Sequence, residues 1–145
     1  MACHWSQRGL RDLAGSLIGR PHYLPVVGRP GDFAVLTGPE AWGGMQQLQA
    51  IVDGPWENKV LARVALKIPR YNPIRKARGV RVPTLVIAGA NDSIVSAQVA
   101  RKAAGRMADA RFTLHASDHF QPYYGDFLEE NVRTQLAFLR KQVAL

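Results

Sequence analysis

Hydrophobic residues follow different spacings before and after residue 80. From Val82 to Gly89 the chain is a nearly unbroken apolar run rich in β-branched residues, which is typical of a buried strand. A shorter run, Arg111–His115, predicts a second strand, and Ala97–Met107 carries small and apolar residues at helical spacing between them. Acidic residues open the closing segment, Asp126–Val143, and basic residues end it, which matches a helix dipole. This predicted helix has an apolar face made of Phe127, Val132, Leu136 and Leu139.

The first part of the chain is less regular. Trp5–Ile18 predicts a short amphipathic helix, and Arg20–Gly44, with five glycines and four prolines, predicts a long ordered loop. A brief helix is expected over Met45–Val52 and a longer one over Trp56–Ile68, ended by Pro69. Residues 71–79 then form a connector. The apolar positions of the first helix are Leu10, Leu13, Ala14 and Leu17.

The order strand, helix, strand after residue 80 predicts a parallel pair joined by a right-handed connection. The loops that leave two such strands emerge at the same edge of the sheet, where ligands and catalytic groups collect in α/β proteins. Asp92 follows the first strand and His119 follows the second. Because neighbouring strands lie about 4.8 Å apart, we expect the carboxylate and the imidazole to approach hydrogen-bonding distance.

Three stretches carry a resemblance to a known family: Val82–Asp92, the triplet Asp118-His119-Phe120, and a terminal helix with Phe138-Leu139-Arg140. Together they resemble the last βαβα of α/β-hydrolases, over about half of the chain. In that family the order along the chain is nucleophile, acid, histidine. The resemblance implies that Asp92 is the acid and His119 the general base for hydrolysis of ester-like or related small substrates. Residues 1–79 are similar in style to a helical and loop cap, and residues 80–145 to the C-terminal core.

Each assignment has an alternative. Asp92 fits an Asx turn beside Asn91, and Asp118 competes for His119 although its adjacency makes it a poor orienter. The alternative for His119 is a surface histidine without a catalytic role. His115 alternates within its strand and is more consistent with a structural role; His4 and His22 carry no supporting pattern, and no histidine pair has metal-binding spacing. Substrate contact is predicted for three aromatic residues, for which packing is an equal alternative: Phe120, Tyr123 and Tyr124.

No nucleophile is recognisable. A nucleophile elbow needs small residues on both sides of the reactive side chain. Ser6 instead has His4 and Arg8 two residues to either side, and Ser16 lies in a helical pattern. The other serines follow the acid, which is the wrong order, and Cys3 has no preceding strand. Only two strands are recognisable where the family has about eight. We therefore expect an incomplete α/β domain, the C-terminal piece of a longer hydrolase, that is inactive as the isolated chain.

The net charge of +8 is unevenly placed. From Lys59 to Arg81 there are eight basic residues and no acidic one, and the remainder balances. A nucleic-acid surface would also need stacking aromatics, and only Tyr71 lies in the cluster. The cluster therefore favours a solvated face over nucleic-acid binding. With one cysteine, no long apolar run and no recognisable signal peptide, the sequence predicts a cytoplasmic protein without cofactor or metal.

Three functions follow from these patterns. The first is a hydrolase of small substrates that lacks its nucleophile-bearing half. The second is a non-catalytic binding or assembly module whose open strand edge pairs with a partner chain. The third, least favoured, is nucleic-acid binding through the basic cluster. The identity of the substrate is not predictable, because specificity in this fold depends on cap and loop geometry.

Overall fold

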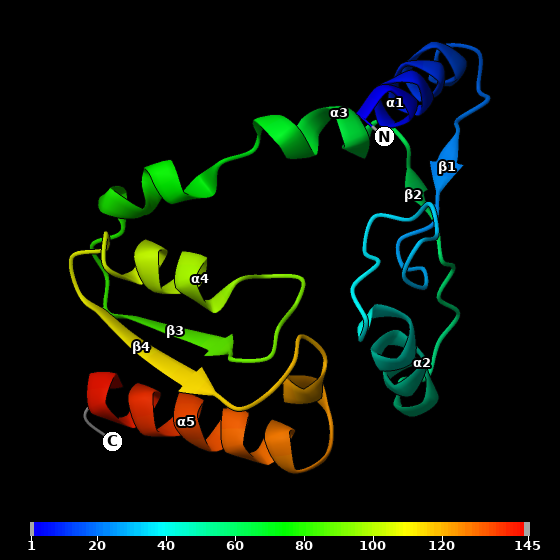
Figure 1. Ribbon diagram of the computed structural model, residues 1–145. Coiled ribbons are helices and arrows are strands. Elements are labelled where there is room, and N and C mark those ends of the chain that lie inside the picture. Colours follow the sequence, from blue (N-terminus) through cyan, green and yellow to red (C-terminus); the bar gives the residue numbers. More distant parts are fainter. Residues whose placement is uncertain (1, 144–145) are drawn as a thin grey trace.

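The computed structural model describes residues 2–143 (Figure 1). Short strands and helices make up residues 2–79, and a strand–helix–strand–helix unit follows. In chain order the elements are α1 (Ala2–Ser16), β1 (Tyr23–Leu24), α2 (Ala41–Ile51), β2 (Val60–Leu61), α3 (Val64–Lys67), the 3-10 helices η1 (Ile68–Arg70) and η2 (Pro73–Gly79), β3 (Thr84–Gly89), α4 (Ala97–Ala104), β4 (Ala110–His115), the 3-10 helix η3 (Gln121–Tyr123) and α5 (Gly125–Val143).

The predicted parallel pair is confirmed. β3 pairs with β4 in parallel from Thr84 opposite Ala110 to Gly89 opposite His115. Figure 1 shows α4 on one face of this pair and α5 on the other. The three expected elements between residues 82 and 115 and the closing helix are all present, each within three residues of its predicted bounds. This unit determines where the loops after β3 and β4 emerge.

Helix α5 does not bury the apolar face that its sequence predicts. Phe127 and Phe138 are half-buried, together with the polar Asn131 and Thr134. By contrast, most of the expected face is exposed: Val132 (42%), Leu136 (45%) and Leu139 (51%). A helix rich in exposed large apolar side chains is unusual for a monomer in water.

Residues 2–79 surround a small core of Leu24, Ala62 and Ala65, against which Trp5 and Phe33 pack. β1 pairs with β2 in antiparallel register. α1 packs closely on α3 at Gly9, where a Cβ would lie 2.6 Å from Leu66 Cγ, so a larger residue there would force the Leu66 side chain to move. The predicted first helix exists but ends at Ser16, two residues before the predicted end, and the expected apolar residues Leu10, Leu13 and Leu17 are exposed.

A buried carboxylate links the parts of this region. Asp12 on α1 is fully buried and accepts hydrogen bonds from the backbone N–H groups of His22 and Arg63, both at 2.9 Å. Arg63 also donates through Nε at 2.7 Å. The hydrogen bond from the Arg63 side chain holds the pKa of Asp12 well below its ordinary range, although burial acts in the opposite direction. One residue thus joins α1 to the segments before β1 and α3.

The helix predicted over Trp56–Ile68 is wrong for its first half. Val60–Leu61 forms strand β2, and helical structure begins only at Val64. Pairing of Val60 and Leu61 with Leu24 and Tyr23 explains the difference. The Asn58 side chain accepts hydrogen bonds from the N–H groups of Val26 and Val27 at 2.8 and 2.9 Å and so holds the residues before β2 against that loop. Apolar residues spaced over one or two turns did not distinguish a strand followed by a short helix from one longer helix.

The loop predicted from Arg20 to Gly44 is largely ordered but contains more structure than expected. It includes β1 and a bridge between Val27 and Leu36, and α2 begins at Ala41, four residues before the predicted start. The connector expected at 71–79 is mostly η2. No helix among residues 2–143 is both long and apolar enough to cross a membrane. The side chain of Cys3 lies outside the described residues.

Candidate functional site

The loop after β3 fixes the Asp92 carboxylate from one side. Its Oδ1 accepts hydrogen bonds from the backbone N–H groups of Ile94 and Val95, at 2.8 and 2.7 Å. The Asx-turn alternative therefore describes one oxygen of this carboxylate correctly. The turn leaves Oδ2 free to face another group, and that group comes from the neighbouring loop.

The loop after β4 fixes Asp118 in a different way. Its Oδ1 accepts hydrogen bonds from the N–H groups of Phe120 and Gln121, both at 2.8 Å, and its own N–H donates to the Gln121 side chain at 2.8 Å. These bonds shape the turn that carries His119 between them. Asp118 is thus directed into its own loop and does not compete for the imidazole.

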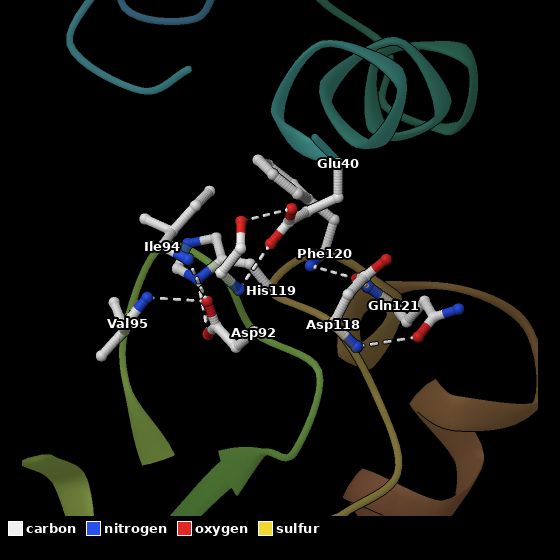
Figure 2. A network of polar contacts seen from close by, with 9 residues as sticks. Glu40, Asp92, Ile94, Val95, Asp118, His119, Phe120 and Gln121 are labelled. Atoms are coloured by element: carbon white, nitrogen blue, oxygen red, sulfur yellow. Dashed lines mark hydrogen bonds and ion pairs between the residues drawn. The ribbon is translucent and has the colours of Figure 1, made fainter. Parts of the chain in front are cut away.

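Asp92 and His119 meet at the edge where both strands end. Figure 2 shows the two side chains pointing toward each other, and Asp92 Oδ2 lies 2.9 Å from His119 Nδ1. The Asp92 side chain is 10% exposed and the His119 side chain 30% exposed. A carboxylate partner places a proton on Nδ1 and leaves Nε2 of the neutral ring as the acceptor. None of the hydrogen bonds found within residues 2–143 uses His119 Nε2.

Backbone contacts join the two loops below this pair. The N–H of Ala90 donates to the His115 carbonyl at 2.8 Å, and that of Asn91 donates to the Ser117 carbonyl at 3.0 Å. A Cβ at Gly89 would lie 2.4 Å from the same Ser117 oxygen, so only glycine permits this approach. The two loops are therefore held together at the strand ends, by residues that precede Asp92 and His119 in the chain.

A groove of about 680 Å³ leads along β3 to this pair. Along β3 it includes Leu85, Ile87 and Gly89, and its walls come from both α4 and α5. The other lining residues are Pro83, Thr84, Ala88, Asp92, Val95, Ala100, Asp118, His119, Pro122, Tyr123, Asn131, Gln135, Phe138 and Leu139. Among the described residues β3 has only β4 as a strand neighbour, so the groove follows its unpaired edge.

The three aromatic residues predicted to contact substrate occupy different environments. Tyr123 lines the groove and is 57% exposed. Phe120 is 3% exposed and packs beneath α2. Tyr124 is half-buried, and burial raises the pKa of its hydroxyl. Their contact with substrate stays a prediction, with Tyr123 the member that the groove includes.

The remaining histidines lie outside the pair. His115 is buried in β4, with Nε2 3.3 Å from the Thr134 hydroxyl, in agreement with a structural role. His4 lies on α1 and His22 before β1. Across residues 2–143 there is no group of three or more His, Cys, Asp or Glu side chains arranged to hold a metal ion.

Sequence reasoning missed Glu40, which lies directly before α2 and reaches the Asp92 loop (Figure 2). Its carboxylate accepts hydrogen bonds from the Ser93 N–H at 2.9 Å and from the Ser93 hydroxyl at 2.6 Å. Ser93, the residue directly after Asp92, therefore donates its hydroxyl to a carboxylate and not to an imidazole. A lone glutamate in a loop carries no motif, so the sequence held no signal for this contact.

Known proteins resemble the chain in sequence and in structure. The family described as Serine hydrolase (FSH1) matches residues 55–130. The quorum-quenching protein AidA of Acinetobacter baumannii (strain MDR-ZJ06) is 30% identical over 135 residues, which is 92% of this chain and 44% of that protein. The chain thus spans less than half the length of this curated relative.

Two solved structures share the fold. The structure of DcsB in complex with its substrate analogue has a TM-score of 0.73 and 19% identity, covering 95% of this chain and 50% of that one. The alpha/beta hydrolase GrgF from Penicillium sp. sh18 has a TM-score of 0.70 and 20% identity, and the match covers 97% of this chain and 49% of the GrgF chain. The expected fold and the expected partial coverage are both confirmed. Since the family match covers just over half of its residues, the chain belongs to the serine hydrolase (FSH1) family and has an α/β-hydrolase fold that spans about half the length of its structural neighbours.

Proposed function

We propose that this chain supplies the acid, Asp92, and the general base, His119, of a nucleophile–histidine–aspartate triad that hydrolyses ester-like or related small substrates. The nucleophile lies on a polypeptide region outside this chain. The observation that carries the proposal is the 2.9 Å contact between Asp92 Oδ2 and His119 Nδ1 at the shared edge of two parallel strands.

The geometry fits a division of labour between the two side chains. Nε2 of His119 takes the proton from the nucleophile's hydroxyl as that oxygen attacks the substrate carbonyl, and the ring then gives the proton to the leaving group. Asp92 keeps the other proton on Nδ1 and stabilises the positively charged ring. Water then attacks the acyl carbonyl while it gives a proton to His119 Nε2, and the ring returns that proton to the nucleophile's oxygen as the acid is released.

The unpaired edge of β3 supports a nucleophile from outside the chain. The Thr84 N–H donates to the Asp109 carbonyl and the Ala90 N–H to the His115 carbonyl, so even-numbered residues of β3 turn toward β4. By the alternation of a parallel ladder, the backbone groups of Leu85, Ile87 and Gly89 turn toward the groove. A further parallel strand in this groove would end at the same edge as Asp92 and His119. In this fold, a strand end at that edge carries the nucleophile.

A small-molecule substrate agrees with the relatives and with the groove. DcsB is described in complex with a substrate analogue, and a further strand paired with β3 would leave the end of the groove that contains the dyad for such a molecule. Tyr123 is the aromatic residue best placed for such contact.

A chimera tests the proposal by covalent capture. This chain replaces the matching 135-residue region of the Acinetobacter relative, and the product is treated with a fluorophosphonate, which labels serines activated by a histidine. We expect label on a serine from the relative's part, loss of label in the His119→Ala chimera, and normal labelling in a matched His4→Ala chimera. The isolated chain should remain unlabelled and hydrolyse an activated ester no faster than its own His119→Ala variant. Label that persists without His119, or label on the isolated chain, would contradict the proposal.

A further inference from the structure

The segment from Gly38 to Gly44, which runs into the first turn of α2, contacts both loops that carry the dyad. It comes from the part of the chain before residue 80, whereas Asp92 and His119 come from the part after it. Figure 2 shows this segment lying over the two loops, with Glu40 reaching toward the Asp92 side and Phe120 rising toward the helix. We call residues 38–44 the clamp segment.

The first contact of the clamp segment is made by Glu40 with the residue next to Asp92. The Glu40 carboxylate accepts from both the backbone N–H and the hydroxyl of Ser93, at 2.9 and 2.6 Å. The backbone also approaches closely, because a Cβ at Gly38 would lie 2.5 Å from the Ser93 hydroxyl oxygen. Two hydrogen bonds from Ser93 to one charged carboxylate fix the orientation of Ser93 as well as its distance from Glu40.

The second contact of the clamp segment is made with the residue next to His119. Phe120 is almost fully buried, and a Cβ at Gly44 would lie within 2.6 Å of its Cβ, Cγ and Cδ2 atoms. The ring therefore lies directly against the helix backbone. Its centroid is 5.1 Å from that of the His119 ring, in an edge-to-face arrangement. The clamp segment thus touches the immediate neighbour of each member of the dyad.

We infer that Glu40 is a positioning residue, which holds the Asp92 loop in place while Gly44 seats the His119 loop, so that the clamp segment sets the geometry of the Asp92–His119 hydrogen bond. The inference rests on the proposed function, because the hydrogen bond it sets is that of the proposed dyad. Glu40 acts through Ser93 and touches neither the imidazole nor a reacting atom.

The electrostatic surroundings of Glu40 keep its carboxylate charged, which strengthens its hydrogen bonds with Ser93. Burial and the nearby Asp92 charge both work against a second carboxylate here. Hydrogen bonds from the Ser93 hydroxyl, from the backbone N–H of Glu40 itself and from the Ser93 N–H together outweigh them and leave the pKa of Glu40 below its ordinary value, so that it stays ionised. A charged acceptor binds its donors more strongly than a neutral one, which suits a contact that must keep a loop in one place.

The test follows the Nδ1 proton of His119 by NMR in the intact chain. This proton is shielded from water only while the Asp92 hydrogen bond is closed, so its exchange rate measures how often the pair opens. In Glu40→Ala we expect exchange to become faster by about tenfold or more, which corresponds to about 1.4 kcal/mol. Glu40→Gln, which still accepts from the Ser93 N–H, should recover most of the protection. The matched control Glu57→Ala removes an exposed glutamate from the same part of the chain and should leave the rate unchanged.

Two further variants separate the possible failures. Asp92→Asn should abolish the protected proton, and a wild-type chain without that proton would overturn the proposed dyad itself. A proton present in the wild type, lost in Asp92→Asn and unchanged in Glu40→Ala would overturn only the role of Glu40. If Glu40→Ala does not fold, Ser93→Ala tests the same contact more mildly, and we expect it to speed exchange in the same direction. Unchanged exchange in Ser93→Ala would likewise count against the clamp.

Discussion

Residues 2–79 keep their shape mainly through polar side chains that bind backbone groups, whereas residues 80–143 rely on a paired strand ladder with a helix on each face. In the first region, the side chains of Asp12 and Asn58 together hold segments of chain that have little regular structure. In the second, β3 and β4 pair over six positions between α4 and α5. The first region therefore depends on a few residues, and the second distributes its stability over many.

The proposed site lies where these two regions meet. The ladder brings Asp92 and His119 to one edge, and Glu40 and Gly44 from the first region contact the loops that carry them. All three tryptophans, at positions 5, 42 and 56, are in the first region. Tryptophan fluorescence thus reports on residues 2–79, while far-UV circular dichroism reports on the helices of both regions.

The largest effect on stability is expected from Asp12→Ala. This change removes a fully buried acceptor and leaves the N–H groups of His22 and Arg63 and the Arg63 side chain without their partner. Breaking a buried ion pair in this way costs about 3 to 5 kcal/mol. We expect the urea midpoint measured by tryptophan fluorescence to fall accordingly.

A matched variant makes this expectation specific. Asp32→Ala also removes a carboxylate from the first region, but Asp32 is exposed and accepts a hydrogen bond from the backbone N–H of Arg29 at 2.7 Å. Its cost should be about 1 kcal/mol or less. Equal losses in the two variants would show that the first region does not depend on Asp12 in the manner described.

The next largest effect is expected from Gly89→Ala at the end of β3. The added methyl would lie 2.4 Å from the Ser117 carbonyl oxygen, so the two loops must separate. We expect a loss of about 2 kcal/mol, with the urea midpoint falling more by circular dichroism than by tryptophan fluorescence. Gly79→Ala is the control, since a Cβ there has no atom within 4 Å. A Gly89→Ala chain as stable as the control would mean that the loops are not in contact at this point.

Acid should weaken the first region through Asp12. Its pKa is lowered in the folded state, chiefly by the Arg63 side chain, so its contribution is complete above the ordinary aspartate pKa of about 3.9 and is lost as the pH falls below that value. One proton changes the free energy of unfolding by at most about 1.4 kcal/mol per pH unit. Urea titrations at successive pH values should show this slope in the wild type and a smaller one in Asp12→Ala. Equal slopes would assign the acid sensitivity to other groups.

The smallest effect is expected at the start of α5, within the more regular region. Asp126 lies in the first turn of this helix, where a negative charge interacts favourably with the helix dipole. Asp126→Asn should cost about 0.5 kcal/mol at low salt and less at high salt. Thermal unfolding followed by circular dichroism measures it. A loss that salt does not reduce would point to a contact other than the dipole.

The comparison also shows what the sequence predicts and why. The ladder of β3 and β4 follows directly from a nearly unbroken apolar run, a helical pattern and a second short strand pattern, and such local signals survive in the fold. β2 could not be predicted in this way. Val60 and Leu61 are held extended by pairing with Leu24 and Tyr23, which lie more than thirty residues away in the sequence. A partner at that distance leaves no periodic trace in the segment itself.

The candidate site divides in the same way. Asp92 and His119 could be placed on one edge from strand order alone, and the structure brings them together. Glu40 could not, since its partner Ser93 is 53 residues away and the contact depends on how the two regions pack. The exposure of the apolar side chains on α5 could not be predicted either, because periodicity indicates an apolar face but not what covers it.

The most direct test of the account asks which carboxylate orients His119 during turnover. In the chimera with the Acinetobacter relative, ester hydrolysis is measured for the parent, Asp92→Asn and Asp118→Asn. The side-chain amide introduced by Asp92→Asn would offer an N–H to Nδ1 of His119 and favour the wrong tautomer, so we expect a loss of about 10⁴-fold. Asp118→Asn, whose oxygen still accepts from Phe120 and Gln121, should remain within severalfold of the parent. An unchanged rate in Asp92→Asn, or an equal loss in Asp118→Asn, would contradict the account.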